Sequence, residues 1–307
     1  MAKALVMYRS LVEQVESFTL YYYCFDETTF RTLQRLKTVD ELYGSLIPVP
    51  IKDLMDPILV EAKSNRTEQE FFFTLTPFVV YHAINTHDLS QCTYLDADIR
   101  FFNNPAPLFD EMQDKSVLIT RHNYSKGLEH LEYAGIYCVQ FNPFRNDVAG
   151  MKVLSWWKEK CAEWCYLRKE DGKWGDQGYL NSWPEMFESV AVSKHSGAGV
   201  APWNVDAFDV LSSSDYKLVE KNSQREFDII FYHFQGVKQF FGRFFFIGSG
   251  RQSEKIKRKL YRPYFRELRK VKAQLKALDP KLEPIGNSDT FADLIVLLKH
   301  IRRRKIM

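Results

Sequence analysis

The sequence lacks a long hydrophobic run, and it also lacks the paired cysteines of zinc and redox motifs. No stretch of about 18 apolar residues occurs, so we predict no transmembrane helix. The N-terminal residues have neither a long apolar core nor a small-residue cleavage site, which predicts no secretory signal. Because the five cysteines form no CxxC pair, we expect reduced core thiols in a cytosolic protein. These cysteines are Cys24, Cys92, Cys138, Cys161 and Cys165.

Internal repeats, low-complexity linkers and nucleic-acid-binding motifs are absent as well. Hydrophobic residues make up 45% of the chain, which is ample for a packed core and excludes the disordered class. Charge is uneven, because residues 251–307 hold 17 lysines and arginines against six acidic residues, a balance of +11. The whole chain carries +3, so residues 1–250 carry −8. We therefore predict a mildly acidic domain over 1–250 and a basic extension over 251–307.

Helical and strand patterns alternate along residues 1–250. Apolar spacing near 3.6 predicts helices over 3–16, 68–86 and 147–167, and a further helix that opens at 174–181 and stops at Pro184. Aromatic and β-branched runs predict strands over 18–25, 46–49, 116–120 and 134–141, with short strands near 189–193 and 228–232. This alternation predicts an α/β fold with a mostly parallel sheet. The extension predicts a basic amphipathic helix over 251–278, interrupted at Pro263, and a last helix over 290–304.

Two carboxylates follow the apolar run that ends at Tyr94 and Leu95. Asp96 and Asp98 stand at i and i+2 where a buried strand ends, and like charges that close repel. A hard divalent cation removes this cost, because Mg²⁺ and Mn²⁺ take oxygen ligands and often bridge a carboxylate to substrate phosphates. The alternative is an ordinary exposed pair at a strand end. We predict a Mn²⁺ or Mg²⁺ site here.

Four motifs in order resemble the GT-A superfamily of nucleotide-sugar-dependent glycosyltransferases, in particular the retaining branch typified by glycogenin and lipooligosaccharide galactosyltransferases. Residues 94–98 are similar to the family's DxD motif, and Ala134-Gly135 resembles the turn on which the donor sugar packs. Residues 175–181 resemble its Asp-Gln plus Asn block, and residues 232–238 resemble its C-terminal His-x-x-Gly motif. The resemblance implies a GT-A fold, Rossmann-like, with helices flanking the sheet.

The resemblance also implies roles for single residues. His233 would be the third protein ligand of the metal, with a histidine buried at a strand end as the alternative. Asp176 and Gln177 would lie at the reaction centre, although Asp176 also suits a simple helix N-cap. The predicted contacts to the donor are Arg66, Tyr94, Ala97, Ala134, Gly135, Gly236 and Lys238.

Three residues, Arg66 of the donor contacts among them, are assigned from their own chemistry and not from the resemblance. Arg66 can reach a phosphate or a sugar hydroxyl, or it can form a salt bridge with Glu70 at i,i+4. Gly199 allows a tight loop beside a ligand, and Trp203 offers an aromatic face to an acceptor sugar. The alternative is a structural turn with a core tryptophan.

The sequence departs from the family pattern in two places. Family members usually begin with a strand that grips the nucleotide base, and that strand is missing from this sequence. Lys238 follows His233 by five residues, where the family usually has six.

The predicted function is a metal-dependent glycosyltransferase that moves a sugar from a nucleotide-diphospho-sugar, a UDP-sugar in the first instance, to a saccharide or glycoconjugate with retention. Surface polysaccharide synthesis is the context that the family implies. One alternative is a nucleotide-sugar-binding protein without turnover. Another is a scaffold protein whose basic tail binds an anionic membrane. If the protein is an enzyme, the same tail could place it beside a lipid-linked acceptor.

Overall fold

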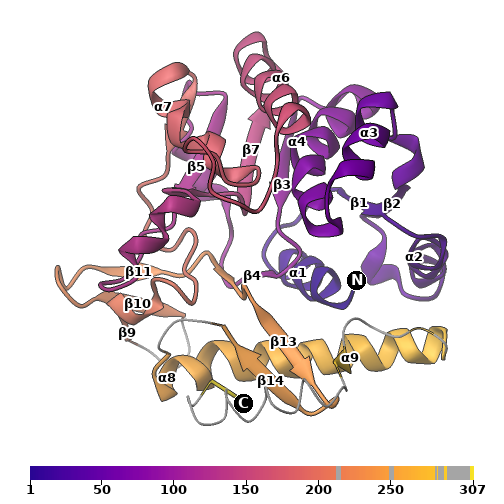
Figure 1. The fold of residues 1–307 in the computed structure, drawn as a ribbon. Coiled ribbons are helices and arrows are strands. Elements are labelled where there is room, and N and C mark those ends of the chain that lie inside the picture. Colours follow the sequence, from indigo (N-terminus) through magenta and orange to yellow (C-terminus); the bar gives the residue numbers. More distant parts are fainter. Residues whose placement is uncertain (212–215, 249–251, 281, 283–286, 289–304) are drawn as a thin grey trace.

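A computed structural model describes residues 1–211, 216–248, 252–280, 282, 287–288 and 305–307 (Figure 1). The predicted helix over 290–304 lies outside these residues. The first part of the chain forms α1 (Ala2–Val12), β1 (Leu20–Cys24), α2 (Glu27–Val39), β2 (Leu46–Pro50), α3 (Pro57–Asn65), α4 (Glu68–His87), β3 (Gln91–Leu95), β4 (Ile99–Phe101), α5 (Ala106–Asp110), β5 (Val117–Arg121), β6 (Tyr137–Cys138), β7 (Phe141–Arg145) and α6 (Val148–Glu163).

The second part consists of shorter strands and ends in a long helix. It forms α7 (Trp183–Met186), β8 (Val190–Val192), β9 (Phe208–Val210), β10 (Lys217–Glu220), β11 (Glu226–Asp228), β12 (Phe231–His233), β13 (Val237–Phe240), β14 (Phe244–Ile247), α8 (Glu254–Ile256), α9 (Arg262–Leu278) and β15 (Asn287–Ser288). None of the helices in the described ranges is long and apolar enough to cross a membrane.

The α/β class and the helical C-terminal region agree with the sequence prediction, but the sheet is mixed rather than mostly parallel. β1 pairs with β2 and β5 pairs with β8 in parallel, whereas β7 runs antiparallel to both β3 and β5. The chain returns from β5 through residues 122–136, which hold a short 3-10 helix over Glu129–Ala134, and β6 and β7 then both run antiparallel to β5. Side-chain periodicity alone did not distinguish the two directions.

Helix α4 carries the chain to the candidate site, and its boundaries follow from its first and last residues. Thr67 accepts a hydrogen bond from the backbone of Glu70, and the Glu70 carboxylate returns to the backbone of Thr67, which forms a capping box. Asp88 ends the helix in a left-handed conformation. The chain then enters β3, which leads directly to Asp96.

Three local predictions were wrong in detail. The stretch 134–141 is not one strand, because a 3-10 helix occupies Glu129–Ala134 and two short strands follow it. Pro184 does not stop a helix but lies in the first turn of α7, where its missing N–H costs nothing. Similarly, the chain remains helical through Pro263, which lies in the first turn of α9 directly after a π-helical turn over Lys257–Tyr261.

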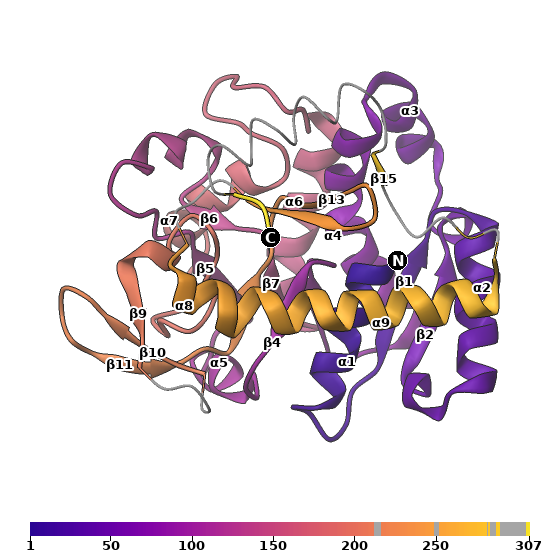
Figure 2. The ribbon, with the colours of Figure 1, turned by 90° about the horizontal axis from the view of Figure 1, so that it is seen from below.

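Helix α9 packs against the body and shares its largest hydrophobic core. Its buried side chains belong to the same cluster as those of α1, β1 and α2. Figure 2 shows α9 lying across α1 along one side of the molecule. At the end of the chain, Met307 exchanges two backbone hydrogen bonds of 2.8 Å with Phe245 of β14. The residues that α9 contributes to the core are Tyr264, Phe265, Leu268, Val271 and Leu275.

Candidate metal centre

Strand pairing brings Asp96, Asp98 and His233 together from distant parts of the sequence. The two aspartates lie in the turn between β3 and β4. β12 runs antiparallel to β4 and places His233 opposite Ile99, the residue after Asp98. The backbone carbonyl of Asp98 also accepts a 2.8 Å hydrogen bond from the N–H of Phe234. The register of a single strand pair therefore fixes the imidazole beside the carboxylates.

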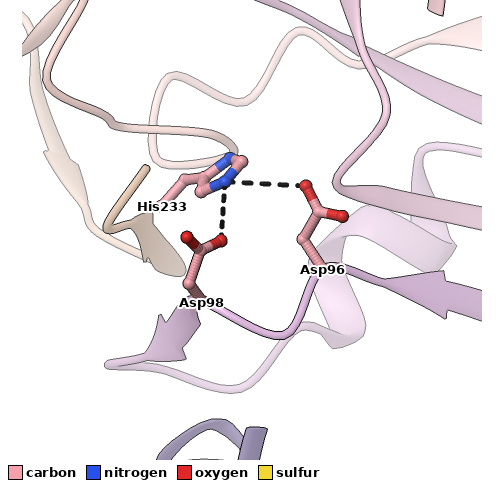
Figure 3. A group of neighbouring side chains, drawn as sticks. All are labelled: Asp96, Asp98 and His233. Carbon is pink, nitrogen blue, oxygen red and sulfur yellow. Dashed lines mark ion pairs between the residues drawn. The ribbon is translucent and has the colours of Figure 1, made fainter. Parts of the chain in front are cut away.

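The three side chains point toward one another (Figure 3). The Nε2 atom of His233 lies 2.9 Å from Oδ1 of Asp98 and 3.5 Å from Oδ2 of Asp96. One donor atom from each residue lies within 4.8 Å of the others. The imidazole is buried, whereas the aspartate side chains remain 25% and 21% exposed. The group is thus open on the carboxylate side and closed behind the histidine.

The pKa values of the group show how its charge is balanced. Burial raises the pKa of Asp96 to about 6, the carboxylate of Asp98 adds to this shift, and His233 opposes it. Burial also disfavours the charged form of Asp98, but the neighbouring His233 and Lys3 outweigh it and hold that pKa well below its usual range. Burial lowers the pKa of His233, yet the ion pair with Asp98 reverses the sign and leaves it raised. The group therefore favours a positive charge at its centre.

These residues fit a divalent cation. Two carboxylate oxygens and an imidazole nitrogen are ligands that suit Mn²⁺, and Mg²⁺ prefers the oxygens. The Nδ1 atom of His233 lies 2.9 Å from Oε1 of Gln140, so Nε2 is the ring nitrogen that faces the carboxylates. Lys3 of α1 forms an ion pair with Asp98, with its Nζ atom 3.3 Å from Oδ2.

Buried polar side chains lie between the group and Asp176. The Tyr94 hydroxyl donates to Oδ1 of Asp96 at 2.9 Å, and the Thr76 hydroxyl of α4 lies beside Tyr94 and Asp176 and lowers the pKa of both. Burial raises the pKa of Asp176 to about 7, with Asp96 acting in the same direction and the hydrogen bond from Thr76 opposing it. Asp176 makes no side-chain N-cap bond to the short helix that follows it. Its carboxyl group is therefore not explained as a helix cap.

The predicted Ala134-Gly135 turn and the Asp-Gln block meet in the structure. The amide of Gln177 donates to the carbonyl of Ala134 at 2.7 Å, and Oδ1 of Asn181 accepts from the N–H of Ile136 at 2.9 Å. Gly135 has φ +137°, and a Cβ there would lie 3.3 Å from Cγ of Gln177. A glycine therefore lets the Gln177 side chain close over the turn.

Arg66 joins α4 to the end of α6. Its guanidinium donates to the hydroxyl of Thr74 at 2.5 Å and to the carbonyls of Cys161 and Ala162 at 2.8 and 2.6 Å. Glu70, four residues further along the chain, closes the capping box of α4 with Thr67. These contacts favour a structural role for Arg66 over a contact with the donor.

Trp203 packs against His233, and Gly199 packs against Gln140, which contacts His233. Trp203 is 6% exposed, its ring meets the His233 ring edge-on at 5.2 Å, and its Nε1 donates to the carbonyl of His122. A Cβ on Gly199 would lie 2.3 Å from Nε2 of Gln140, so only glycine leaves room for that amide. Both residues support the metal centre from behind, which favours this role over stacking on an acceptor sugar.

The remaining predicted donor contacts are Ala97, Gly236 and Lys238. Ala97 sits between the two aspartates in the β3–β4 turn. Gly236 adopts φ +73° in the turn from β12 to β13, where a Cβ would lie 3.9 Å from the Cα of Gly248. Lys238 is exposed on β13.

Sequence reasoning missed Lys3, Gln140 and Thr76. Lys3 lies in an unremarkable helical segment and approaches Asp98 only because α1 packs against β4. Gln140 lies within a predicted strand, where a buried amide carries no motif. Only tertiary structure brings these side chains to the group.

The fold and the site define an α/β protein with a preformed acidic and imidazole cluster that can hold a divalent cation. The chain is 31% identical to the uncharacterised protein YfnF of Bacillus subtilis (strain 168) over 244 residues, which are 77% of this chain and 78% of the relative. It is 30% identical to YfnD of the same strain over 241 residues, 76% of this chain and 73% of that relative. The chain belongs to the family of these two proteins.

Comparison with solved structures gives a distant likeness. A glycosyltransferase involved in the glycosylation of the major capsid of PBCV-1 superposes with a TM-score of 0.40 at 13% identity, covering 71% of this chain and 92% of that one. No protein-family model matches the sequence.

Proposed function

We propose that this protein is a metal-dependent glycosyltransferase of the GT-A type that uses a nucleotide-diphospho-sugar donor, in the first instance a UDP-sugar. The observation that carries the proposal is the convergence of Asp96, Asp98 and His233 on one point. These are the residues that the resemblance to retaining GT-A enzymes assigns to the metal. A Mn²⁺ or Mg²⁺ ion held there supplies positive charge against the departing diphosphate.

The chain's own residues support the roles assigned to the donor sugar and the reaction centre. We assign the Ala134-Gly135 turn to the donor sugar. The side-chain amide of Gln177 donates to this turn, so its role is to hold the turn in place. Asp176 is 5% exposed, and Thr76 lies between it and Tyr94, which donates to Asp96. A carboxyl group with a pKa near 7 in such a place can hold a proton or a substrate hydroxyl during transfer. Retention of configuration is part of this proposal and rests on the family resemblance.

Lys3 extends the proposal to the leaving group. Its ammonium neutralises Asp98 at 3.3 Å and is still partly exposed. A cation that close to the metal ligands is within reach of the phosphate oxygens that the metal would bridge. We assign Lys3 to the donor diphosphate, beside the contacts proposed for Ala97, Gly236 and Lys238.

The acceptor is proposed to be a saccharide or a lipid-linked saccharide of surface polysaccharide synthesis at the inner face of the membrane. The structure changes how the tail would reach that membrane, because the apolar face of α9 is already buried in the body. What remains exposed is a basic stripe along α8 and α9, which suits electrostatic contact with anionic lipids. The basic stripe consists of Lys255, Arg258, Arg262, Arg266, Arg269 and Lys276.

The test is release of UDP by purified protein from a panel of UDP-sugars, with and without Mn²⁺. We expect Mn²⁺-dependent release that Asp98→Asn lowers about 1,000-fold, since a metal ion supplies several kcal/mol to the transition state. Asp114→Asn, an exposed aspartate outside the group, is the matched control and should match the wild type.

The same assay separates the alternatives. Binding of UDP-sugars without release of UDP would identify a nucleotide-sugar-binding protein that lacks turnover. Release that is unaffected by both Mn²⁺ and Asp98→Asn would reject the metal-dependent mechanism.

A further inference from the structure

Gln140 contacts both halves of the metal centre. Its backbone carbonyl accepts a 3.0 Å hydrogen bond from the N–H of Asp96. Its side-chain Oε1 lies 2.9 Å from Nδ1 of His233, and its Nε2 donates to the hydroxyl of Thr120 at 2.9 Å. The residue is fully buried. One amino acid thus connects the β3–β4 turn to the histidine that strand β12 contributes.

We propose that Gln140 is a positioning residue for cation binding: its amide oxygen holds the proton of His233 on Nδ1 and thereby keeps the Nε2 lone pair directed at Asp96 and Asp98. This inference rests on the proposed metal site and names a determinant that neither the motifs nor the relatives identify. A ligating histidine needs its other ring nitrogen hydrogen-bonded in this way, because that bond sets both the tautomer and the ring orientation.

The surroundings of Gln140 fix which end of its amide faces the histidine. With Nε2 donating to Thr120, the oxygen is left for His233. On the Nε2 side, the glycine at position 199 leaves room for the amide, because a Cβ there would lie 2.3 Å from Nε2 of Gln140. On the far side of the imidazole, Trp203 packs edge-on at 5.2 Å. The ring is therefore held by a hydrogen bond on one edge and by an indole on its flank.

The experiment measures the Kd of Mn²⁺ by electron paramagnetic resonance, with no nucleotide present, so that turnover is not the readout. Gln140→Met keeps the length of the side chain but removes the acceptor, and we expect its Kd to rise about 10- to 100-fold. Gln140→Glu keeps an oxygen at the same place and should bind Mn²⁺ within about threefold of the wild type, or more tightly. Rescue by an acceptor distinguishes positioning from packing.

The matched control is Asn142→Leu. Asn142 is a buried amide two residues along the chain whose side-chain atoms have no hydrogen-bond partner among the residues that the structure describes. The control should leave the Kd of Mn²⁺ unchanged. Unfolding in guanidinium with a chelator present checks that each variant is folded, and Gly199→Ala provides a second way to disturb the amide.

The outcomes separate this inference from the proposed function. If the wild type binds Mn²⁺, Asp98→Asn does not, and Gln140→Met binds like the wild type, the role of Gln140 is rejected and the metal site stands. Equal weakening in Gln140→Met and Gln140→Glu also rejects it. If the wild type itself binds no Mn²⁺, the metal site fails and the inference fails with it.

Discussion

Charged groups are partly buried at the candidate metal centre and exposed along α9, and this contrast explains how each region is held. At the centre, His233 and Lys3 contact the carboxylate of Asp98 and Gln140 contacts His233, so polar contacts determine the geometry. Along α9, apolar side chains fill the core that α1 also lines, and the cations remain in solvent. Small polar substitutions at the first region should therefore change its chemistry without unfolding the protein. In the second region, the loss of apolar side-chain volume should lower stability.

The largest effect on stability is expected from Leu268→Ala in α9. Leu268 is 3% exposed in the core shared with α1, so truncation removes apolar contacts and leaves a cavity. We expect a loss of about 2–5 kcal/mol in the free energy of unfolding, measured by urea denaturation. Lys276→Ala on the exposed face is the control. A loss below that of the control would show that α9 is an appendage and not part of the core.

The next largest effect concerns the basic stripe. Replacing Arg262, Arg266 and Arg269 by alanine removes about 1 kcal/mol of attraction to an anionic membrane per residue, or about 100-fold in partitioning. Flotation with anionic vesicles at low salt measures this, and the wild type should detach at high salt. The control replaces three exposed lysines elsewhere, Lys52, Lys63 and Lys126. Equal flotation of both triple variants, or none by the wild type, would remove the membrane from the proposal.

Asp176→Asn tests whether burial raises the pKa of the Asp176 carboxyl group in the folded protein. The pKa of Asp176 is raised to about 7 in the folded protein, whereas an unfolded aspartate ionises near pH 4. Between these values the native state binds the extra proton, so its stability falls as pH rises, by at most about 1.4 kcal/mol per pH unit. The asparagine variant lacks this loss.

The measurement is urea unfolding of both proteins at pH 5, 6 and 7 with a chelator present. We expect the stability of Asp176→Asn relative to the wild type to increase with pH, by about 1–3 kcal/mol across this range. Asp114→Asn should follow the wild type. Parallel profiles for Asp176→Asn and the wild type would contradict a raised pKa.

The smallest effect is expected from Lys3→Ala. Loss of one charged contact to a diphosphate should lower kcat/KM for the donor about 10-fold. Lys52→Ala, an exposed lysine on another element, is the control. The proposed role of Lys3 requires the loss to appear with every UDP-sugar that the enzyme accepts. A loss confined to one sugar would place Lys3 beside the sugar instead of the diphosphate.

Several elements of the fold follow directly from the sequence. The periodic apolar positions of α4 and α6 predict those helices within a few residues, and the Thr67–Glu70 pattern accounts for the start of α4. The direction of strand pairing did not follow, because an apolar run packs equally well in parallel and antiparallel sheets. The polar face of α9 was visible in the sequence, but not the surface that its apolar face covers.

The sequence by itself determined the α/β class and pointed to the three side chains of the candidate metal centre, because strand ends and local motifs are properties of short segments. Only the tertiary structure decided that Lys3 and Gln140 join them, that Arg66 holds α6 and that Trp203 supports His233. Those roles depend on which surfaces meet when α1, β7 and β12 pack around one turn. Such contacts join residues far apart along the chain, and no local pattern encodes them.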